Sequence, residues 1–252
     1  MLRVTGLGCE LHGKMLFENV HFEAGEGEKI ILLGQNGSGK STLLAMLNGL
    51  IPPDVGRIAY DGHELTQKSL KDPAFSRRFR LETGLVFQDP SAMLFHPTVG
   101  DELAFGPTQA GKKNVREIVM HCAEHFGILH LLETPPYQLS GGERQKVALA
   151  CVMINRPRVL LLDEPAANLD PASTGWLIDT IQKLDATVIT SVHHLSMARE
   201  LGERALVLGE GGLIFDGHID DFTHNLDLMV RAGLAHRHGH HKDGKWHVHD
   251  WG

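Results

Sequence analysis

The residues best suited to chemistry lie in one stretch, Gly34-Gln35-Asn36-Gly37-Ser38-Gly39-Lys40-Ser41-Thr42. Glycines at positions 37 and 39 let the backbone curl, so that successive N–H groups point at one anion. Lys40 can reach the β- and γ-phosphates of a nucleotide, and the Ser41 hydroxyl can bind Mg²⁺. The spacing therefore predicts a site for nucleotide phosphates.

The elements expected around this stretch are those that a phosphate loop requires. An apolar run at 29–33 indicates a buried strand that leads into the loop. A helical stretch at 41–49 leads out of it, and the positive end of the helix dipole points at the bound anion. A Gly-rich turn could match the spacing by chance, but this strand–loop–helix order favours the phosphate loop.

Two adjacent acids form a second group with chemical potential. Asp163 and Glu164 follow the apolar run 159–162, which indicates a strand buried on both faces of a parallel sheet. Ligands of open α/β sheets bind at the carboxyl ends of the strands. Asp163 is a predicted Mg²⁺ ligand, directly or through water, and Glu164 can orient or deprotonate a water molecule. The alternative is a strand that simply ends in a polar turn.

A third motif opens a predicted helix with the sequence Leu139-Ser140-Gly141-Gly142-Glu143-Arg144-Gln145. A hydroxyl and two glycines at a helix start leave free N–H groups, so we expect a second anion cradle at 140–142. A chain with one phosphate loop has no evident need of two cradles. The pair makes sense if this cradle covers a nucleotide that another copy of the protein holds.

The composition limits the class of protein. A chain of 252 residues is long enough for one large α/β domain. The net charge of −7 argues against a nucleic-acid partner, although Arg77, Arg78 and Arg80 could form a local basic patch. Three widely spaced cysteines suggest neither a disulfide framework nor a cysteine zinc site. No apolar run reaches a membrane-spanning length and no signal peptide is evident, which favours the cytosol.

The order of the expected elements defines a fold class. The expected strands are 2–7, 15–24, 29–33, 57–60, 85–87, 159–162, 187–191, 205–208 and 213–215. The expected helices are 40–49, several between 98 and 132, 140–153, 171–184 and 194–201. This order predicts an α/β fold with a mixed β-sheet core, an antiparallel β part and a helical insert at about 98–155. We expect one domain over residues 1–235 and a flexible tail over 236–252.

These motifs, in this order, resemble those of the nucleotide-binding subunit of ATP-binding cassette (ABC) transporters over about residues 2–217. The matching segments are the phosphate loop 34–42, the Gln-loop at Gln88, the signature 139–145, the Walker B segment 159–165, the D-loop 168–170 and the switch histidine His193. The resemblance implies the P-loop NTPase fold of ABC ATPase type. It also implies ATP hydrolysis, with ATP and Mg²⁺ as cofactors.

The resemblance further implies partners and roles. Two copies would pair head to tail, with each ATP between one copy's phosphate loop and the Ser140–Gly142 cradle of the other. Glu164 would be the general base and His193 would hold the γ-phosphate. Gln88 would touch the Mg²⁺ or the attacking water and sense a membrane subunit, and Asp170 would communicate across the dimer. The protein would then lie at the cytoplasmic face of the membrane, bound to integral membrane transport subunits.

Two positions depart from the family's pattern. Relatives usually stack an aromatic residue on adenine near the end of the first strand, where this sequence has Leu11, with His12 as the only nearby ring. The switch motif carries His194 after the histidine, where many relatives carry an acid. The sequence therefore predicts no named adenine contact.

The segment around Gln88 carries a finer resemblance. The stretches 86–90, 94–95 and 98–107 resemble the energy-coupling-factor branch of ABC importers, which includes cobalt and nickel importers and several vitamin importers. Met93, Leu94 and Phe95 would then contact the coupling helix of a membrane subunit. The alternative is that these residues belong to an ordinary core segment.

The end of the chain is rich in histidine. Six of the seventeen histidines are His236, His238, His240, His241, His247 and His249. Neutral imidazole suits Ni²⁺, Co²⁺, Cu²⁺ and Zn²⁺. The tail could bind or buffer a transported metal, be a solvated tail without a role, or remain from an expression tag.

Together these features predict a homodimeric ATPase subunit of a membrane complex that imports Co²⁺ or Ni²⁺. Two alternatives keep the ATPase: an energy-coupling-factor ATPase for a vitamin, and a soluble ABC ATPase with no transporter. A third is a metal-storage or chaperone protein in which the tail is primary, and the complete hydrolytic set of residues argues against it.

Overall fold

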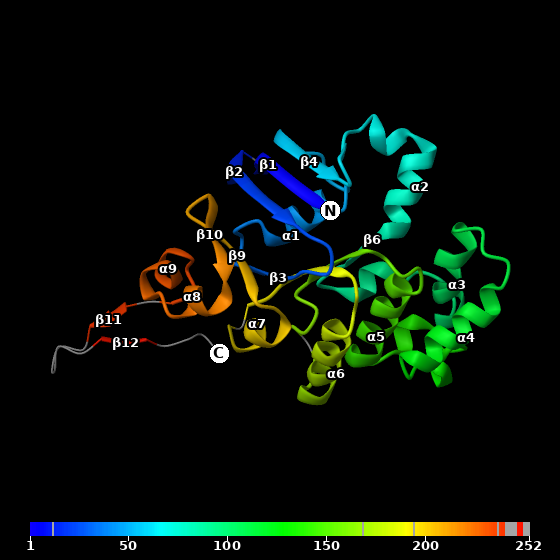
Figure 1. Ribbon diagram of the computed structural model, residues 1–252. Coiled ribbons are helices and arrows are strands. Elements are labelled where there is room, and N and C mark those ends of the chain that lie inside the picture. Colours follow the sequence, from blue (N-terminus) through cyan, green and yellow to red (C-terminus); the bar gives the residue numbers. More distant parts are fainter. Residues whose placement is uncertain (12, 168, 194, 236, 240–245, 249–252) are drawn as a thin grey trace.

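The computed structural model describes residues 1–252 except 12, 168, 194, 236, 240–245 and 249–252. Two main sheets and the helices that cover them make up the molecule (Figure 1). Within these described residues, no helix is both long and apolar enough to cross a membrane. The predicted α/β fold, with a mixed sheet and an antiparallel β part, is confirmed.

The central sheet has six strands in the order β10-β9-β3-β8-β7-β6. Along the chain they are β3 (Lys29–Leu33), β6 (Thr83–Val86), β7 (Val159–Asp163), β8 (Thr187–Ser191), β9 (Arg204–Gly209) and β10 (Gly212–His218). All neighbouring pairs are parallel except β9 and β10. Because parallel strands end at one edge, the residues that follow β3, β6, β7 and β8 meet there.

The second sheet is antiparallel, in the order β2-β1-β4-β5. Its strands are β1 (Leu2–Leu11), β2 (Lys14–Ala24), β4 (Val55–Tyr60) and β5 (His63–Glu64). Strand β1 continues past the expected end at residue 7. Its register with β2 shifts on both sides of Leu7, and the two strands then pair again as far as Leu11. Gly6, with φ = +57°, lies within the first shift, where glycine takes up the irregular backbone without strain.

One hydrophobic cluster joins the antiparallel sheet, helix α1 (Lys40–Leu47) and one face of the central sheet. Ile30 and Leu32 of β3 point into this cluster, whereas Ile31 and Leu33 point into the cluster on the other face. This alternation is the two-residue period of a strand. Because both faces of the sheet are covered at β3, the residues that point to either face are apolar.

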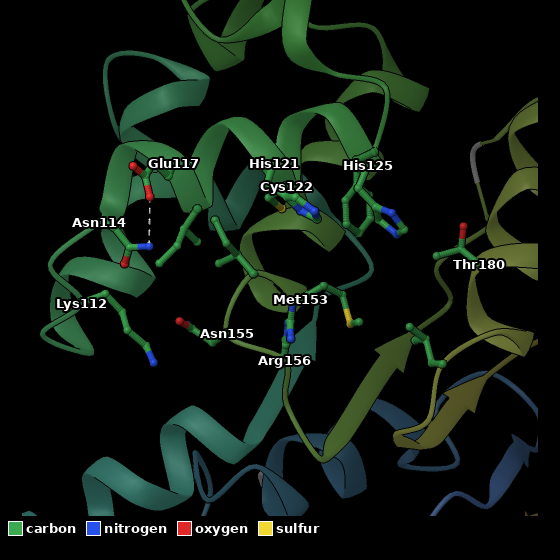
Figure 2. Close-up of a pocket in the computed structure, with 14 residues that line it drawn as sticks. Lys112, Asn114, Glu117, His121, Cys122, His125, Met153, Asn155, Arg156 and Thr180 are labelled. Carbon is green, nitrogen blue, oxygen red and sulfur yellow. Dashed lines mark hydrogen bonds between the residues drawn. The ribbon is translucent and has the colours of Figure 1, made fainter.

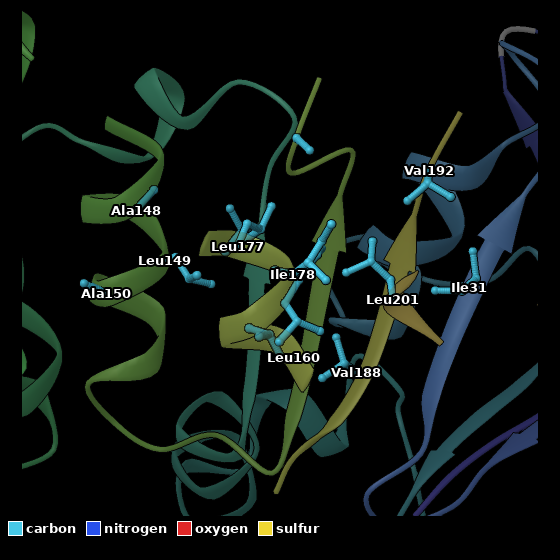
Figure 3. Close-up of a cluster of buried hydrophobic side chains, with 14 of the residues drawn as sticks. Ile31, Ala148, Leu149, Ala150, Leu160, Leu177, Ile178, Val188, Val192 and Leu201 are labelled. Atoms are coloured by element: carbon cyan, nitrogen blue, oxygen red, sulfur yellow. The ribbon is translucent and has the colours of Figure 1, made fainter. Parts of the chain in front are cut away.

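Helices cover the other face of the central sheet. They are α3 (Val99–Gln109), α4 (Val115–His125), α5 (Gly141–Met153), α6 (Pro171–Gln182) and α7 (Leu195–Leu201). Figure 3 shows Leu160 and Val188 of the sheet beside Leu177 and Ile178 of α6, all in one buried cluster. Helices α3, α4 and α5 lie together at the side of the sheet that ends in β6 (Figure 1).

Side-chain caps fix where three of these helices begin. The Thr98 hydroxyl accepts a hydrogen bond from the Asp101 N–H at the start of α3 (3.1 Å). Ser140 and Glu143 form a capping box at the start of α5. Asp170 accepts hydrogen bonds from two backbone N–H groups of α6, each at 3.0 Å. These caps set the positions of the signature and of the D-loop.

Three helices were not expected from the sequence: α2 (Pro73–Glu82), α8 (Ile219–Thr223) and α9 (Leu226–Arg231). Helix α2 buries only Phe79, so it lacks the apolar periodicity that marks a helix. Its arginines serve contacts within the chain. Arg78 pairs with Asp61 (2.6 Å) and Glu82 (3.0 Å), and Arg77 donates to the Ala110 carbonyl oxygen (2.8 Å).

Two short strands lie at the end of the chain, in the segment where a flexible tail is predicted. Strands β11 (Arg237–Gly239) and β12 (Trp246–Val248) pair antiparallel, with residue 238 opposite residue 247. The other four tail histidines, at 236, 240, 241 and 249, lie outside the described residues. Short 3₁₀ turns at 69–71, 90–93, 129–131 and 136–138 complete the described elements.

Candidate nucleotide-binding and hydrolysis site

The phosphate loop lies between β3 and α1, at the edge where the parallel strands end. Gly34 has φ = +147°, and a Cβ at this position would lie 2.6 Å from the Leu208 carbonyl oxygen. At Gly39, φ is +95° and a Cβ would lie 2.8 Å from the Phe17 ring. Because both positions exclude a side chain, the loop keeps its curled backbone only with glycine.

Lys40 lies under the loop and is only 5% exposed. Its ammonium group donates hydrogen bonds to the carbonyl oxygens of Gly34 (2.8 Å) and Gln35 (3.3 Å). Burial lowers the pKa of Lys40, and the nearby carboxylates of Glu164 and Asp163 oppose that shift. A cation held within the loop in this way can form charge-assisted hydrogen bonds with phosphate oxygens.

The loop also contains a polar group that lacks a partner. The Ser38 hydroxyl oxygen is buried, and no atom of the described residues forms a hydrogen bond with it. An unpaired buried hydroxyl costs about 1–3 kcal/mol, so the loop favours a ligand that supplies a partner. Ser41, at the start of α1, is exposed instead.

Ser191 connects the two acids at the end of β7. Its hydroxyl donates to Asp163 Oδ1 (2.6 Å) and accepts from the Glu164 N–H (2.9 Å). Glu164 has φ = +45°, an uncommon backbone conformation for a residue other than glycine. The sequence analysis gave Ser191 no role, although it ends the strand beside β7 and pairs in register with Asp163.

The carboxylate of Glu164 lies between two polar side chains from neighbouring strand ends. Gln88 Nε2 donates to one of its oxygens (2.9 Å), and His193 Nε2 lies 2.5 Å from the other. Gln88 follows β6, Glu164 follows β7 and His193 follows β8. The three side chains that the motifs predicted to act together are therefore in contact, and their chemical roles stay predictions.

A cavity of about 400 Å³ opens at this place. The residues that line it are Leu11, Leu16, Asn36, Gly37, Gly39, Lys40, Ser41, Thr42, Gln88, Glu164 and His193. Leu11 and Leu16 give one end of the cavity an aliphatic surface, where many relatives are expected to carry an aromatic ring. Leu16 was not foreseen, and His12 lies outside the described residues.

The signature lies apart from this cavity. Ser140 and Gly141 are exposed and do not belong to its described lining. The Ser140 N–H donates to Glu143 Oε2 (2.8 Å), and the Glu143 N–H donates to the Ser140 hydroxyl (3.4 Å). The capping box therefore uses one N–H group of the expected cradle at 140–142, that of Ser140, and leaves those of Gly141 and Gly142.

Asp170, the D-loop acid, caps α6 close to the signature. A Cβ at Gly142 would lie 3.0 Å from the Ser173 hydroxyl, which donates to Asp170 Oδ2 (2.7 Å). Hydrogen bonds from Ser173 hold the pKa of Asp170 below its usual value. The starts of α5 and α6 therefore pack together in one chain, away from that chain's own phosphate loop. Asn168 of the D-loop and His194 of the switch motif lie outside the described residues.

This geometry agrees with the comparisons to known proteins. The ABC transporter family matches residues 17–167, and the chain belongs to this family. An ABC transporter ATP-binding protein of Gloeobacter violaceus, so named, is 41% identical, with 89% of this chain and 96% of that protein covered. One of Methanosarcina acetivorans is 37% identical, with 89% and 85% covered. The chain is therefore an ABC ATPase that binds and hydrolyses ATP.

Two solved structures share the fold. The structure of cbiO1 from Clostridium perfringens, part of the ABC transporter complex cbiONQ, has a TM-score of 0.75 and 29% identity, with 92% of this chain and 94% of that chain covered. The ATP-binding cassette MJ0796, dimeric in a post-hydrolysis state with ADP and Pi, has a TM-score of 0.76 and 25% identity, with 87% and 99% covered. The predicted P-loop NTPase fold of ABC type is confirmed.

We expect Glu164→Gln to retain ATP binding and to lower the turnover rate by about 100-fold or more. General-base catalysis contributes on the order of 10²–10⁴, and an amide of the same size cannot accept the proton. Steady-state hydrolysis and calorimetric ATP binding measure the two effects. Glu124→Gln, an exposed acid of α4, is the matched control. Turnover at the wild-type rate in Glu164→Gln would show that another group is the base.

Proposed function

We propose that the protein is the ATP-hydrolysing subunit of a membrane importer and that it works as a head-to-tail homodimer. The observation that carries the proposal is that one chain holds two separated halves of a site. The cavity gathers the phosphate loop and Glu164, whereas Ser140 and Gly141 are exposed elsewhere. A second copy can bring its α5 over the first copy's loop, and a two-fold pairing then completes both sites.

In this dimer each ATP has contacts from both copies. One copy supplies Gly34, Gln35, Asn36, Gly37, Ser38, Gly39, Lys40, Ser41 and Thr42. The other copy supplies Ser140, Gly141 and Gly142, with Asp170 beside them. The partnerless Ser38 hydroxyl and the buried Lys40 ammonium support the first set. The contact between the starts of α5 and α6 supports the second, because signature and D-loop can move as one unit.

The donors at this site fit Mg²⁺ bound together with the nucleotide. Ser41 and Gln88 line the cavity. Asp163 is the last residue of β7 and directly precedes Glu164. Within the described residues, no group of three His, Cys, Asp or Glu side chains is ready to hold a metal. Mg²⁺ usually takes one or two protein ligands, with phosphates and waters completing the shell. When bound, it would neutralise charge on the phosphates.

The remaining chemistry falls to side chains of this chain. Glu164, positioned by Gln88 and His193, would take a proton from the attacking water. His193 would turn to the γ-phosphate when the nucleotide enters, and Gln88 would move to the Mg²⁺ or the water. Lys40 would stabilise the charge that develops on the transferred phosphoryl group.

An exposed aromatic surface beside Gln88 favours a membrane partner. Phe95 is 72% exposed and lies edge to face with Phe105, with the ring centres 6.1 Å apart. Phe87, next to Gln88, is also exposed. Met93 and Leu94, which were expected in the same contact, pack partly against the core instead. Exposed aromatic clusters mark docking sites. We assign this one to an integral membrane subunit, which would hold the protein at the cytoplasmic face.

The proposed cargo is Co²⁺ or Ni²⁺. The segment around Gln88 resembles the energy-coupling-factor branch, and the fold is close to that of cbiO1. The tail adds histidines, and positions 238 and 247 pair in register on β11 and β12. An energy-coupling-factor ATPase for a vitamin shares the first two features but gives the histidines no purpose. A soluble ABC ATPase without a transporter leaves the aromatic surface without a partner.

Phe95→Ser should weaken binding to the membrane subunit about 30-fold, because truncating an aromatic anchor costs on the order of 2 kcal/mol. Co-purification of integral membrane protein with the wild-type chain measures this binding, and basal ATP hydrolysis should stay unchanged. Met120→Ser, an exposed apolar residue of α4, is the control. If no integral membrane protein accompanies the wild-type chain from membranes solubilised in mild detergent, the soluble ATPase is the better account.

Removing residues 236–252 should reduce Ni²⁺ binding, measured by calorimetry, at least about tenfold, since imidazoles are the preferred ligands of this ion. ATP affinity should not change, because the tail begins beyond the elements that line the nucleotide cavity. Unchanged Ni²⁺ affinity after the deletion would leave the histidines without a metal role.

A further inference from the structure

A second, larger cavity lies in the helical region, with a volume of about 670 Å³. It opens beneath α4 and is bounded by the loop before α4, the end of α5 and the last turns of α6 (Figure 2). None of its lining residues belongs to the nucleotide cavity. Its volume lies within the range of small-molecule sites, about 300–1,000 Å³.

The inner wall of this cavity is apolar. It is formed by Ile118 and Cys122 of α4, Phe126 directly after this helix, and Met153 and Ile154 at the end of α5. The Cys122 thiol is directed toward the Ala150 carbonyl oxygen (3.8 Å), and burial raises its pKa to about 11. The thiol therefore stays protonated and serves as a small apolar group rather than as a nucleophile or metal ligand. This wall suits the hydrocarbon part of a ligand.

The rim of the cavity is cationic. Lys112 and Arg156 both line the opening, and His121 and His125 stand one turn apart on α4 (Figure 2). Glu117 is the one carboxylate of the lining, and it accepts a hydrogen bond from Asn114 (3.3 Å). The rim is therefore positive, although the chain as a whole has a net charge of −7. It favours an anionic ligand.

The rim cations are also unpaired. Within the described residues, neither Lys112 nor Arg156 forms an ion pair or a side-chain hydrogen bond. Arg158, two residues further on, pairs with Glu26 and Asp61. Arg156 has φ = +53°, and its N–H donates to the Met153 carbonyl oxygen (2.8 Å), which fixes the backbone at the mouth of the cavity. A guanidinium without a carboxylate partner can bind one from a ligand.

We propose that this cavity is an effector site for a small soluble amphiphile with an apolar body and one anionic group. The apolar body would lie against Ile118 and Met153, and the anion would bind Lys112 and Arg156. A metal ion fits the two histidines less well, because no group of three ligating side chains is present within the described residues.

The walls of the cavity explain why a ligand would change ATP hydrolysis. Helix α5 begins at the signature, and α6 begins at the Asp170 cap. The same two helices end at the cavity, where Met153 and Thr180 line it together with α4. A ligand that bridges α4, α5 and α6 would hold α4 against the unit that carries the signature and the D-loop. The ligand would thereby favour or oppose the approach of the second copy. The size of this effect equals the difference between its affinities for the monomer and for the dimer.

Decanoate tests the site directly, with binding measured by calorimetry and by displacement of the anionic fluorophore 1-anilinonaphthalene-8-sulfonate. The full-length protein should bind decanoate, and the doubly substituted variant Lys112→Gln/Arg156→Asn should bind it at least about tenfold more weakly. Asparagine suits the positive φ at position 156. The matched control is Lys113→Gln/Arg116→Gln, two neighbouring cations outside the lining. Decylamine, with the same chain and the opposite charge, should bind at least about tenfold more weakly than decanoate.

ATP hydrolysis distinguishes an effector from an inert ligand. Saturating decanoate should change the turnover of the wild-type protein and of the control at least about twofold, and that of the double variant not at all. Ile118→Trp, which fills the apolar wall, should remove the effect while ATP binding is retained.

Equal binding of decanoate and decylamine, or equal decanoate binding by the double variant and the control, would overturn the site. Binding without any change in turnover would overturn its role as an effector site. Decanoate-independent sedimentation with phosphatidylglycerol vesicles that is lost in the double variant would assign the cations to a membrane surface and contradict a soluble ligand.

Discussion

The parallel register of β3, β8 and β7 is the constraint on which the rest of the structure depends. Leu32 pairs with Ser191, and Ser191 pairs with Asp163, so three strands far apart in sequence end at the same level. Whatever follows each strand must therefore arrive at one edge. The phosphate loop, Glu164 and His193 meet for this reason, and Ser191 links the acids from the neighbouring strand. A slip in this register would separate groups that are now in contact.

The same fold keeps the signature away from that edge. Helix α5 begins at a capping box and packs its first turn against the start of α6, so the cradle and the D-loop are fixed to each other rather than to the loop of their own chain. In the proposed dimer, each chain thus carries two separate parts of a site, one at the phosphate loop and one at the signature. On this proposal catalysis depends on association of two copies, and association is the step through which a membrane partner would be coupled to ATP binding.

The sequence was most informative where one physical requirement dominates. The strands 29–33 and 187–191 were predicted at their observed bounds, because segments buried on both faces must be apolar throughout. Helix α5 was predicted to within one residue, because its cap is a local interaction. The resemblance to ABC ATPases implied that Gln88, Glu164 and His193 act at one site, and the structure brings them into contact. Helix α2 was missed because Phe79 is its only buried residue, and the register shifts of β1 have no signal beyond a glycine. The cavity under α4 could not be foreseen either, since Lys112 and Arg156 come together only through tertiary packing.

The central claim is that a complete hydrolytic site needs two copies of the chain. Its most direct test is ATP turnover per subunit over a dilution series, with the fraction of dimer in ATP measured by light scattering in the same samples. The account predicts that turnover per subunit falls in step with the dimer fraction, while ATP binding through Lys40 persists in the monomer. Turnover per subunit that stays constant at concentrations where only monomer remains would contradict it.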